Sequence, residues 1–287
     1  SLPVSLPLSI ARGAALGRVS VRGMVLSANL EMAVRLCGAL AAWQLGLGLP
    51  GIVAAIGLSL VAGWWPVRGQ TGTAQRVATA PGEWRGLALR IGVLAAPFAL
   101  LQVAQVGHLD ADLLLSATLL SGDQADLLAG LSLVQRIQFY ACFGLAGVLL
   151  PTMTRAIADG RPLSGPITPV AAIVGGTGLL LLGAALIDPE FIIKAVAGPG
   201  FVSAAPALAP TICAAFCFTV SYIAATLLAA MKDISGIAIV ALALPGLVVV
   251  LWLASAQGGL SQLIWAKAAF QAVLAVFLIW RVRIVLK

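Results

Sequence analysis

Four long uncharged runs constrain this chain more than any other feature of its sequence. Residues 36–67, 162–187, 195–231 and 234–266 contain no Asp, Glu, Lys or Arg. A helix crosses the hydrocarbon core of a bilayer with about 20 apolar residues, so each run has room for at least one span. Of the 287 residues, 9% are charged, whereas soluble domains carry about 25%. A water-soluble fold is therefore excluded.

The same runs point to helices rather than strands. They lack the alternation of apolar and polar residues that marks a membrane β-barrel, and a backbone in hydrocarbon must satisfy its hydrogen bonds within helices. We predict an all-α, polytopic membrane helix bundle with eight complete spans after a partial helix at the start. The predicted spans are residues 23–45, 47–67, 87–106, 127–150, 167–187, 203–231, 234–254 and 260–280. Residues 112–120 either extend the third span or form a short outer segment.

The distribution of charge predicts the orientation of these spans. Every second connection is basic, and together these connections hold 13 basic residues: Arg12, Arg18, Arg22, Arg68, Arg76, Arg85, Arg90, Arg155, Arg161, Lys232, Arg281, Arg283 and Lys287. The alternate connections hold Lys194 and six acids, namely Asp110, Asp112, Asp123, Asp126, Asp188 and Glu190. Cytoplasmic loops are enriched in Lys and Arg. We therefore expect a multi-pass membrane protein with its C-terminus in the cytoplasm.

A polar connection divides the chain into two lobes. Residues 68–85 are rich in Gly, Thr, Ala and Pro, which is typical of a linker. We predict that residues 1–67 are the remainder of an N-terminal helical lobe, and that residues 86–287 form a C-terminal lobe of six transmembrane helices. The chain starts without methionine, so we expect the natural protein to extend further toward the N-terminus.

Three stretches carry a family resemblance. Residues 86–139 combine a helix with an internal proline, an Asp followed by apolar residues, a turn, and a helix with an arginine. In residues 147–161 a helix ends near proline before a basic loop, and residues 188–216 contain a Gly-x-Gly-Phe element. This pattern resembles the polysaccharide flippases of the multidrug/oligosaccharidyl-lipid/polysaccharide exporter superfamily, and the chain looks like their C-terminal two thirds.

The resemblance implies a two-lobe exporter of a bacterial cytoplasmic (inner) membrane that works by alternating access. Its substrate would be an undecaprenyl-pyrophosphate-linked oligosaccharide or a similar anionic lipid-linked sugar, and a polysaccharide polymerase would be an accessory partner. A small-molecule (multidrug-type) exporter and a lipid II flippase of the same superfamily are the alternatives. A membrane-embedded glycosyl- or acyltransferase would need clustered acids or histidines, and the chain has one histidine. We predict no enzyme, no cofactor, no metal and no binding of nucleic acid.

Charged side chains inside the spans are the candidate functional residues, because insertion scales put their cost at about 2.5–3.5 kcal/mol each at a helix centre. Glu31 and Arg35 lie four residues apart and could simply neutralise each other. Arg136 and Lys267 have no partner nearby in sequence, and could snorkel or join helices. Our functional hypothesis is a cationic cavity that binds a diphosphate and sugar hydroxyls, lined by Arg35, Arg136, Lys267, Glu31, Tyr140 and Gln271.

A cluster of titratable residues follows the third predicted span. His108 lies beside Asp110 and Asp112 near the predicted outer surface. Histidine changes charge near neutral pH, so a site for coupling to protons or cations is one interpretation. We favour the other interpretation, a solvated outer turn, and keep the two aspartates as candidate coupling residues.

The orientation can be tested with single cysteines in a background that lacks the four native cysteines. Thr73→Cys and Asp123→Cys should react with a membrane-impermeant maleimide from opposite sides, because the basic connections are cytoplasmic. Reaction of both variants from the same side of sealed vesicles would show that the number of spans between them is wrong.

Overall fold

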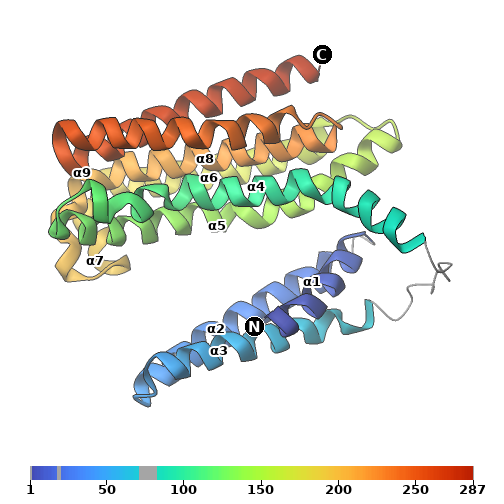
Figure 1. Ribbon diagram of the computed structural model, residues 1–287, viewed down its shortest axis with the longest axis horizontal. Helices are drawn as coiled ribbons and strands as arrows, with labels where there is room; N and C mark the ends of the chain where they lie inside the picture. Colours follow the sequence, from blue (N-terminus) through green and yellow to red (C-terminus); the bar gives the residue numbers. More distant parts are fainter. Residues whose placement is uncertain (1, 18–20, 71–82, 287) are drawn as a thin grey trace. The chain divides into compact units, whose positions relative to one another are not determined.

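The computed structural model describes residues 2–17, 21–70 and 83–286. Every regular element in these ranges is a helix, which confirms the prediction of an all-α fold (Figure 1). The chain divides into two compact units, Ser1–Gly82 (unit 1) and Glu83–Lys287 (unit 2). Most of the linker predicted at 68–85 lies outside the described residues. The preceding helix, η1, ends at Gln70, and α4 begins at Glu83.

Eight segments of the described residues are long and apolar enough to cross a membrane, as predicted. They are Arg22–Gln44, Gly48–Gly69, Leu89–Leu119, Gly122–Ala158, Ser164–Ile187, Pro199–Ala230, Ser235–Ala256 and Gly258–Val285. The protein is therefore a multi-span membrane protein.

Unit 1 contains α1 (Leu2–Gly17), α2 (Val21–Gln44), α3 (Gly48–Trp64) and the 3-10 helix η1 (Trp65–Gln70). Helices α2 and α3 form a hairpin whose turn holds Gly46 and Gly48 at φ values of 67° and 57°. Glycine adopts this left-handed conformation without the steric cost that other residues incur. Helix α1 packs on this hairpin through a small apolar core of Leu8, Ala11, Ala15 and Val67.

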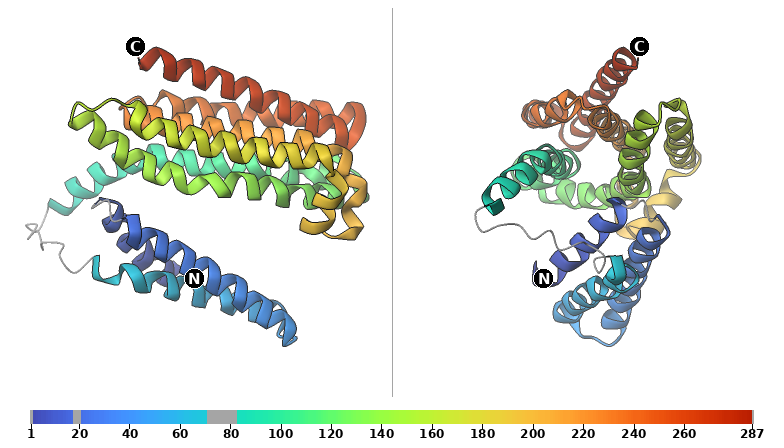
Figure 2. Two further views of the ribbon diagram at one scale, coloured as in Figure 1. Left: turned by 180° about the vertical axis from the view of Figure 1, so that it is seen from behind. Right: turned by 90° about the vertical axis from the view of Figure 1, so that its right-hand side faces the viewer.

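Unit 2 contains α4 (Glu83–Leu119), α5 (Gly122–Ala158), α6 (Ser164–Ile187), α7 (Pro189–Val196), η2 (Pro199–Ala207), α8 (Leu208–Ala230) and α9 (Ser235–Val285). Helix α9 is broken at Gly258 and Gly259, so its two halves return antiparallel to each other and make two spans (Figure 2). Helix α8 lies between α5, α6 and α9, and most of its residues are buried.

The ends of α9 meet at the turn that follows α8. Arg281 Nη2 donates a hydrogen bond to Asp233 Oδ2 over 2.9 Å, and the Ser235 backbone N–H donates to Asp233 Oδ1 over 2.9 Å. Hydrogen bonds from Ser235, together with the charge of Arg281, hold the pKa of Asp233 below its ordinary value. This contact fixes the last turn of α9 beside its first.

Helix α4 is longer than the predicted span of 87–106, because it continues unbroken to Leu119. Asp112 lies seven residues before that end, or about 10 Å along the helix axis. Asp110 and Asp112 are therefore helical, and their assignment to an outer connection is wrong, whereas the alternative that residues 112–120 extend the third span is correct. The extension of α4 beyond the predicted span determines where the polar groups of unit 2 lie.

Close packing of α6 against α8 depends on one glycine. A Cβ added at Gly178 would overlap the ring of Phe216, whereas Gly175 and Gly176 have no neighbouring atom within 4 Å of an added Cβ. Of these three glycines of α6, only Gly178 lies where a larger side chain would prevent the close approach of the two helices.

Two valine substitutions on α6 should distinguish the effect of overpacking on stability from the effect of valine's helix propensity. Gly178→Val should lower the free energy of unfolding by about 1–3 kcal/mol, because overpacking forces neighbouring groups to move. Gly183→Val is the matched control, since nothing lies within 4 Å of a Cβ at Gly183. Unfolding in mixed micelles measures the difference. Equal losses in both variants would contradict the packing role of Gly178.

Candidate functional site: a buried polar network in unit 2

One face of α4 carries polar side chains into the interior of unit 2. Gln105, His108 and Asp112 follow each other at spacings of three and four residues, which places them on one side of a helix. All three side chains are buried. The interpretation of His108 and Asp112 as part of a solvated outer turn is therefore wrong, because α4 continues past both residues and packs against its neighbours.

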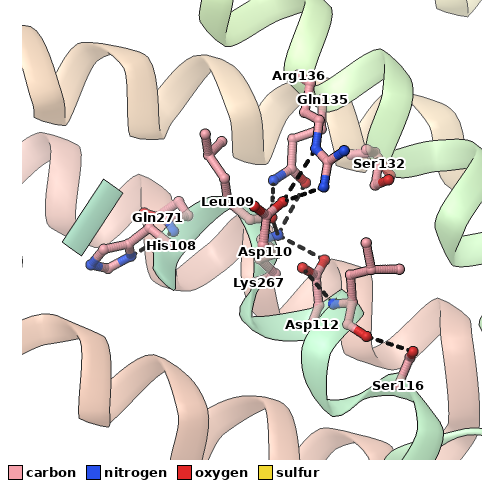
Figure 3. Close-up of polar contacts among 12 residues, drawn as sticks. His108, Leu109, Asp110, Asp112, Ser116, Ser132, Gln135, Arg136, Lys267 and Gln271 are labelled. Atoms are coloured by element: carbon pink, nitrogen blue, oxygen red, sulfur yellow. Dashed lines mark hydrogen bonds and ion pairs between the residues drawn. The ribbon is translucent and has the colours of Figure 1, made fainter. Parts of the chain in front are cut away.

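The ammonium group of Lys267 lies at the centre of this network (Figure 3). Its Nζ donates hydrogen bonds to Asp112 Oδ2 over 2.7 Å, to Gln135 Oε1 over 3.0 Å and to the carbonyl of Leu109 over 3.2 Å. The Lys267 and Asp112 side chains are 3% and 4% exposed. Since an ammonium has three N–H donors, all of them are satisfied by oxygens from α4 and α5.

A second set of contacts holds these groups in place. Gln135 Nε2 donates to the carbonyl of Leu109 over 2.6 Å. His108 Nε2 lies 2.9 Å from the carbonyl of Val240, and Gln271 Nε2 lies 3.0 Å from His108 Nδ1. A carbonyl oxygen only accepts, so His108 carries a proton on Nε2 in this arrangement. The network thus links α4, α5 and both halves of α9.

Several buried amide atoms of the same region have no hydrogen-bond partner among the described residues. They are Gln105 Oε1, both amide atoms of Gln138, and Gln271 Oε1. Buried polar atoms are usually hydrogen-bonded, because an unpaired group loses the contacts it makes with water. These three glutamines make the interior of unit 2 more polar than helix packing in a membrane requires.

Arg136 makes a separate and more accessible ion pair. Its Nη2 and Nε lie 2.9 Å and 3.3 Å from Asp110 Oδ1, and the two side chains are 39% and 24% exposed. This contact joins α5 to α4. Tyr140, one turn along α5, is exposed and places its ring edge against Phe139 at 5.4 Å. The structure therefore brings Lys267 and Gln271 into the buried network, and leaves Tyr140 outside it.

Unit 1 holds the other charged cluster, built around Glu31 of α2. Arg12 Nη2 lies 2.7 Å from Glu31 Oε2, and Arg35 forms an ion pair with Glu31 Oε1. Arg12 Nε also donates to Ser27 Oγ over 2.8 Å, and Arg35 Nε to Ser59 Oγ over 3.3 Å. Arg12 was predicted in a basic connection, which is wrong, because it lies in α1 and pairs with a carboxylate within the helices.

Sequence reasoning found most of these residues and missed their partners. The predicted pairing of Glu31 with Arg35 is present, but Arg136 and Lys267, which have no partner nearby in sequence, pair with aspartates of α4. Gln135 was missed, although it adjoins Arg136 in sequence. The hypothesis that these groups bind a substrate in one cavity stays a prediction.

Comparisons with known proteins give no counterpart for this site. No family model, curated protein or solved structure matches the chain. In the parts of the chain that the structure describes, no group of three His, Cys, Asp or Glu could hold a metal ion. Roles for the network must therefore be argued from its contacts.

Breaking the buried ion pair from one side should destabilise the protein strongly. Lys267→Met leaves the Asp112 carboxylate buried without its cation, and we expect the free energy of unfolding to fall by about 3–5 kcal/mol. The double variant Lys267→Met/Asp112→Asn removes both charges and should recover most of that loss. Unfolding in mixed micelles measures both values.

A matched control for these variants is the exposed ion pair of Arg161 and Asp159, which follows the end of α5. Arg161→Gln should change the free energy of unfolding by less than about 1 kcal/mol, as is usual for exposed pairs. If the double variant at Lys267 and Asp112 were as unstable as Lys267→Met alone, the loss would not come from an unpaired charge.

Proposed function

We propose that this multi-span membrane protein is a transporter that moves an anionic lipid-linked oligosaccharide, or a polysaccharide precursor, across the cytoplasmic membrane by alternating access. Two lines of reasoning support the proposal. The stretches 86–139, 147–161 and 188–216 resemble polysaccharide flippases. Charged side chains also lie inside the spans of both units, and intramembrane charges commonly mark the path of a substrate or ion.

The observation that carries the proposal is an excess of positive charge in unit 1. Arg12 and Arg35 share one carboxylate, that of Glu31, so the cluster has two cations and one anion. The two arginine side chains are 27% and 37% exposed, but Nη2 of Arg12 is buried, so Arg35 is the more accessible of the two. A diphosphate would balance the charge, and the guanidinium fork matches the geometry of phosphate oxygens.

Alternating access requires a change in how the helices pack as well as a site for the substrate, and the ion pairs of unit 2 fit this requirement. A helix bundle that changes shape needs contacts that can break and re-form without leaving an uncompensated charge. Lys267–Asp112 and Arg136–Asp110 join α9 and α5 to α4 as neutral pairs. We assign coupling to the pair of Lys267 and Asp112, and we assign substrate contact to the more exposed Arg136.

Transport can be tested in proteoliposomes that contain the natural protein and a fluorescent undecaprenyl-diphosphate-linked oligosaccharide. An impermeant reductant that bleaches only the outer leaflet reports the rate of flipping. Arg35→Gln should slow flipping by about tenfold or more, because a hydrogen bond to a charged group is lost. Arg35→Lys should retain part of the rate, since the charge remains while the fork does not.

The control for this assay is Arg161→Gln, which removes an exposed arginine outside both clusters. It should flip the probe at the rate of the unmodified protein. Unchanged flipping by the double variant Arg12→Gln/Arg35→Gln would refute the assignment of the unit 1 cluster to substrate binding.

A further inference from the structure

An apolar groove runs along unit 2, outside the polar network described above. It encloses about 470 Å³ between α6 and the second half of α9, with α8 behind it. Its lining includes Ile167, Gly175, Phe216, Leu227, Val282 and Arg283. Figure 2 shows α6 beside α8 along much of its length. Pockets of a few hundred Å³ with mostly apolar walls and few polar groups are typical of ligand sites.

The one charged residue in the lining of this groove is Arg283. Its side chain is exposed, and it makes no hydrogen bond or ion pair with the described residues, in contrast to Arg281, which binds Asp233. No acidic residue lines the groove. A guanidinium without a carboxylate partner at an apolar groove is complementary to a ligand that has an apolar chain and an anionic group.

The position and length of the groove match one leaflet of a bilayer. Arg283 lies in the last turn of α9, at the end of unit 2 that also carries Arg155 and Lys232 and that is predicted to be cytoplasmic. From Leu227 to Phe216 the groove follows α8 for eleven residues, or about 16 Å. The hydrocarbon core of a bilayer is about 30 Å thick, so the groove reaches about its middle.

We propose that this groove binds one acyl chain of an anionic phospholipid of the cytoplasmic leaflet, with the lipid phosphate at Arg283. The chain lies against α6, α8 and α9 and fills the space between the first and the last of these helices. Arginine binds phosphate by charge-assisted hydrogen bonds, and the cytoplasmic leaflet is rich in anionic lipids. The site is independent of the proposed transport function, because it involves none of the residues assigned to substrate or coupling.

Native mass spectrometry of the whole chain in detergent, titrated with phosphatidylglycerol or with phosphatidylcholine of the same acyl chains, tests the site. We expect one phosphatidylglycerol to bind about tenfold more tightly than phosphatidylcholine, in line with one charged hydrogen bond. Arg283→Gln should abolish this preference. Arg155→Gln, an exposed arginine outside the groove, should keep it.

Two glycines of α6 supply a matched pair for the apolar part of the groove. Gly175 lines the groove and Gly176 does not, and nothing lies within 4 Å of a Cβ at either position. Gly175→Leu should fill the groove and abolish binding of the lipid, whereas Gly176→Leu should bind it as the unmodified protein does. If Gly175→Leu does not fold, the exposed Arg283→Gln variant still decides the question.

The proposal would be overturned by equal binding of the two lipids to the unmodified chain or by a preference that Arg283→Gln retains. It would equally be overturned by equal loss of binding in Gly175→Leu and Gly176→Leu, or by loss of the preference in Arg155→Gln. A photo-crosslinking residue at Val170, which also lines the groove, should capture lipid. Capture of a second copy of the chain, or of another protein, would show instead that a polypeptide covers the groove.

Discussion

The ammonium group of Lys267 must find oxygen atoms inside unit 2, and much of the arrangement of that unit follows from this need. A charge in hydrocarbon is stable only where polar groups replace its hydration. Asp112, Gln135 and the carbonyl of Leu109 supply these groups. Because they come from α4 and α5 while Lys267 comes from α9, the three helices can satisfy the charge only together. The hydrogen bonds of Lys267 therefore hold together the same helices that the surrounding apolar side chains hold together.

The charged clusters of the two units differ in their balance of cations and carboxylates. In unit 2 Arg136 and Lys267 each have an aspartate of their own, so these two clusters are neutral. In unit 1 Arg12 and Arg35 share Glu31. A neutral pair lets helices come together without attracting a ligand, whereas two cations on one carboxylate leave an unbalanced positive charge. The first arrangement suits an interface between helices, and the second suits the capture of an anion.

The fold could be predicted from sequence because hydropathy and charge position are local signals. Apolar runs between charges and turn residues predicted eight spans, and all eight are present. The sequence did not decide whether residues 112–120 extend α4 or form an outer segment, because Asp110 and Asp112 look like the start of a loop. Their partners, Arg136 and Lys267, lie 26 and 155 residues away, and only the folded chain brings them close. Arg12 was misplaced for the same reason, since its partner Glu31 belongs to another helix.

A buried ion pair adds little stability to a structure, but it makes the structure sensitive to the loss of either partner. Apolar residues of similar volume in place of such a pair often stabilise a protein as well or better, whereas loss of one partner is costly. The contact between Lys267 and Asp112 thus makes the joining of α9 to α4 sensitive to the loss of either charge. Arg136 and Asp110 are more exposed, so water can compensate a charge that loses its partner there. The two aspartates lie on one helix, yet burial makes only the contact of Asp112 costly to break.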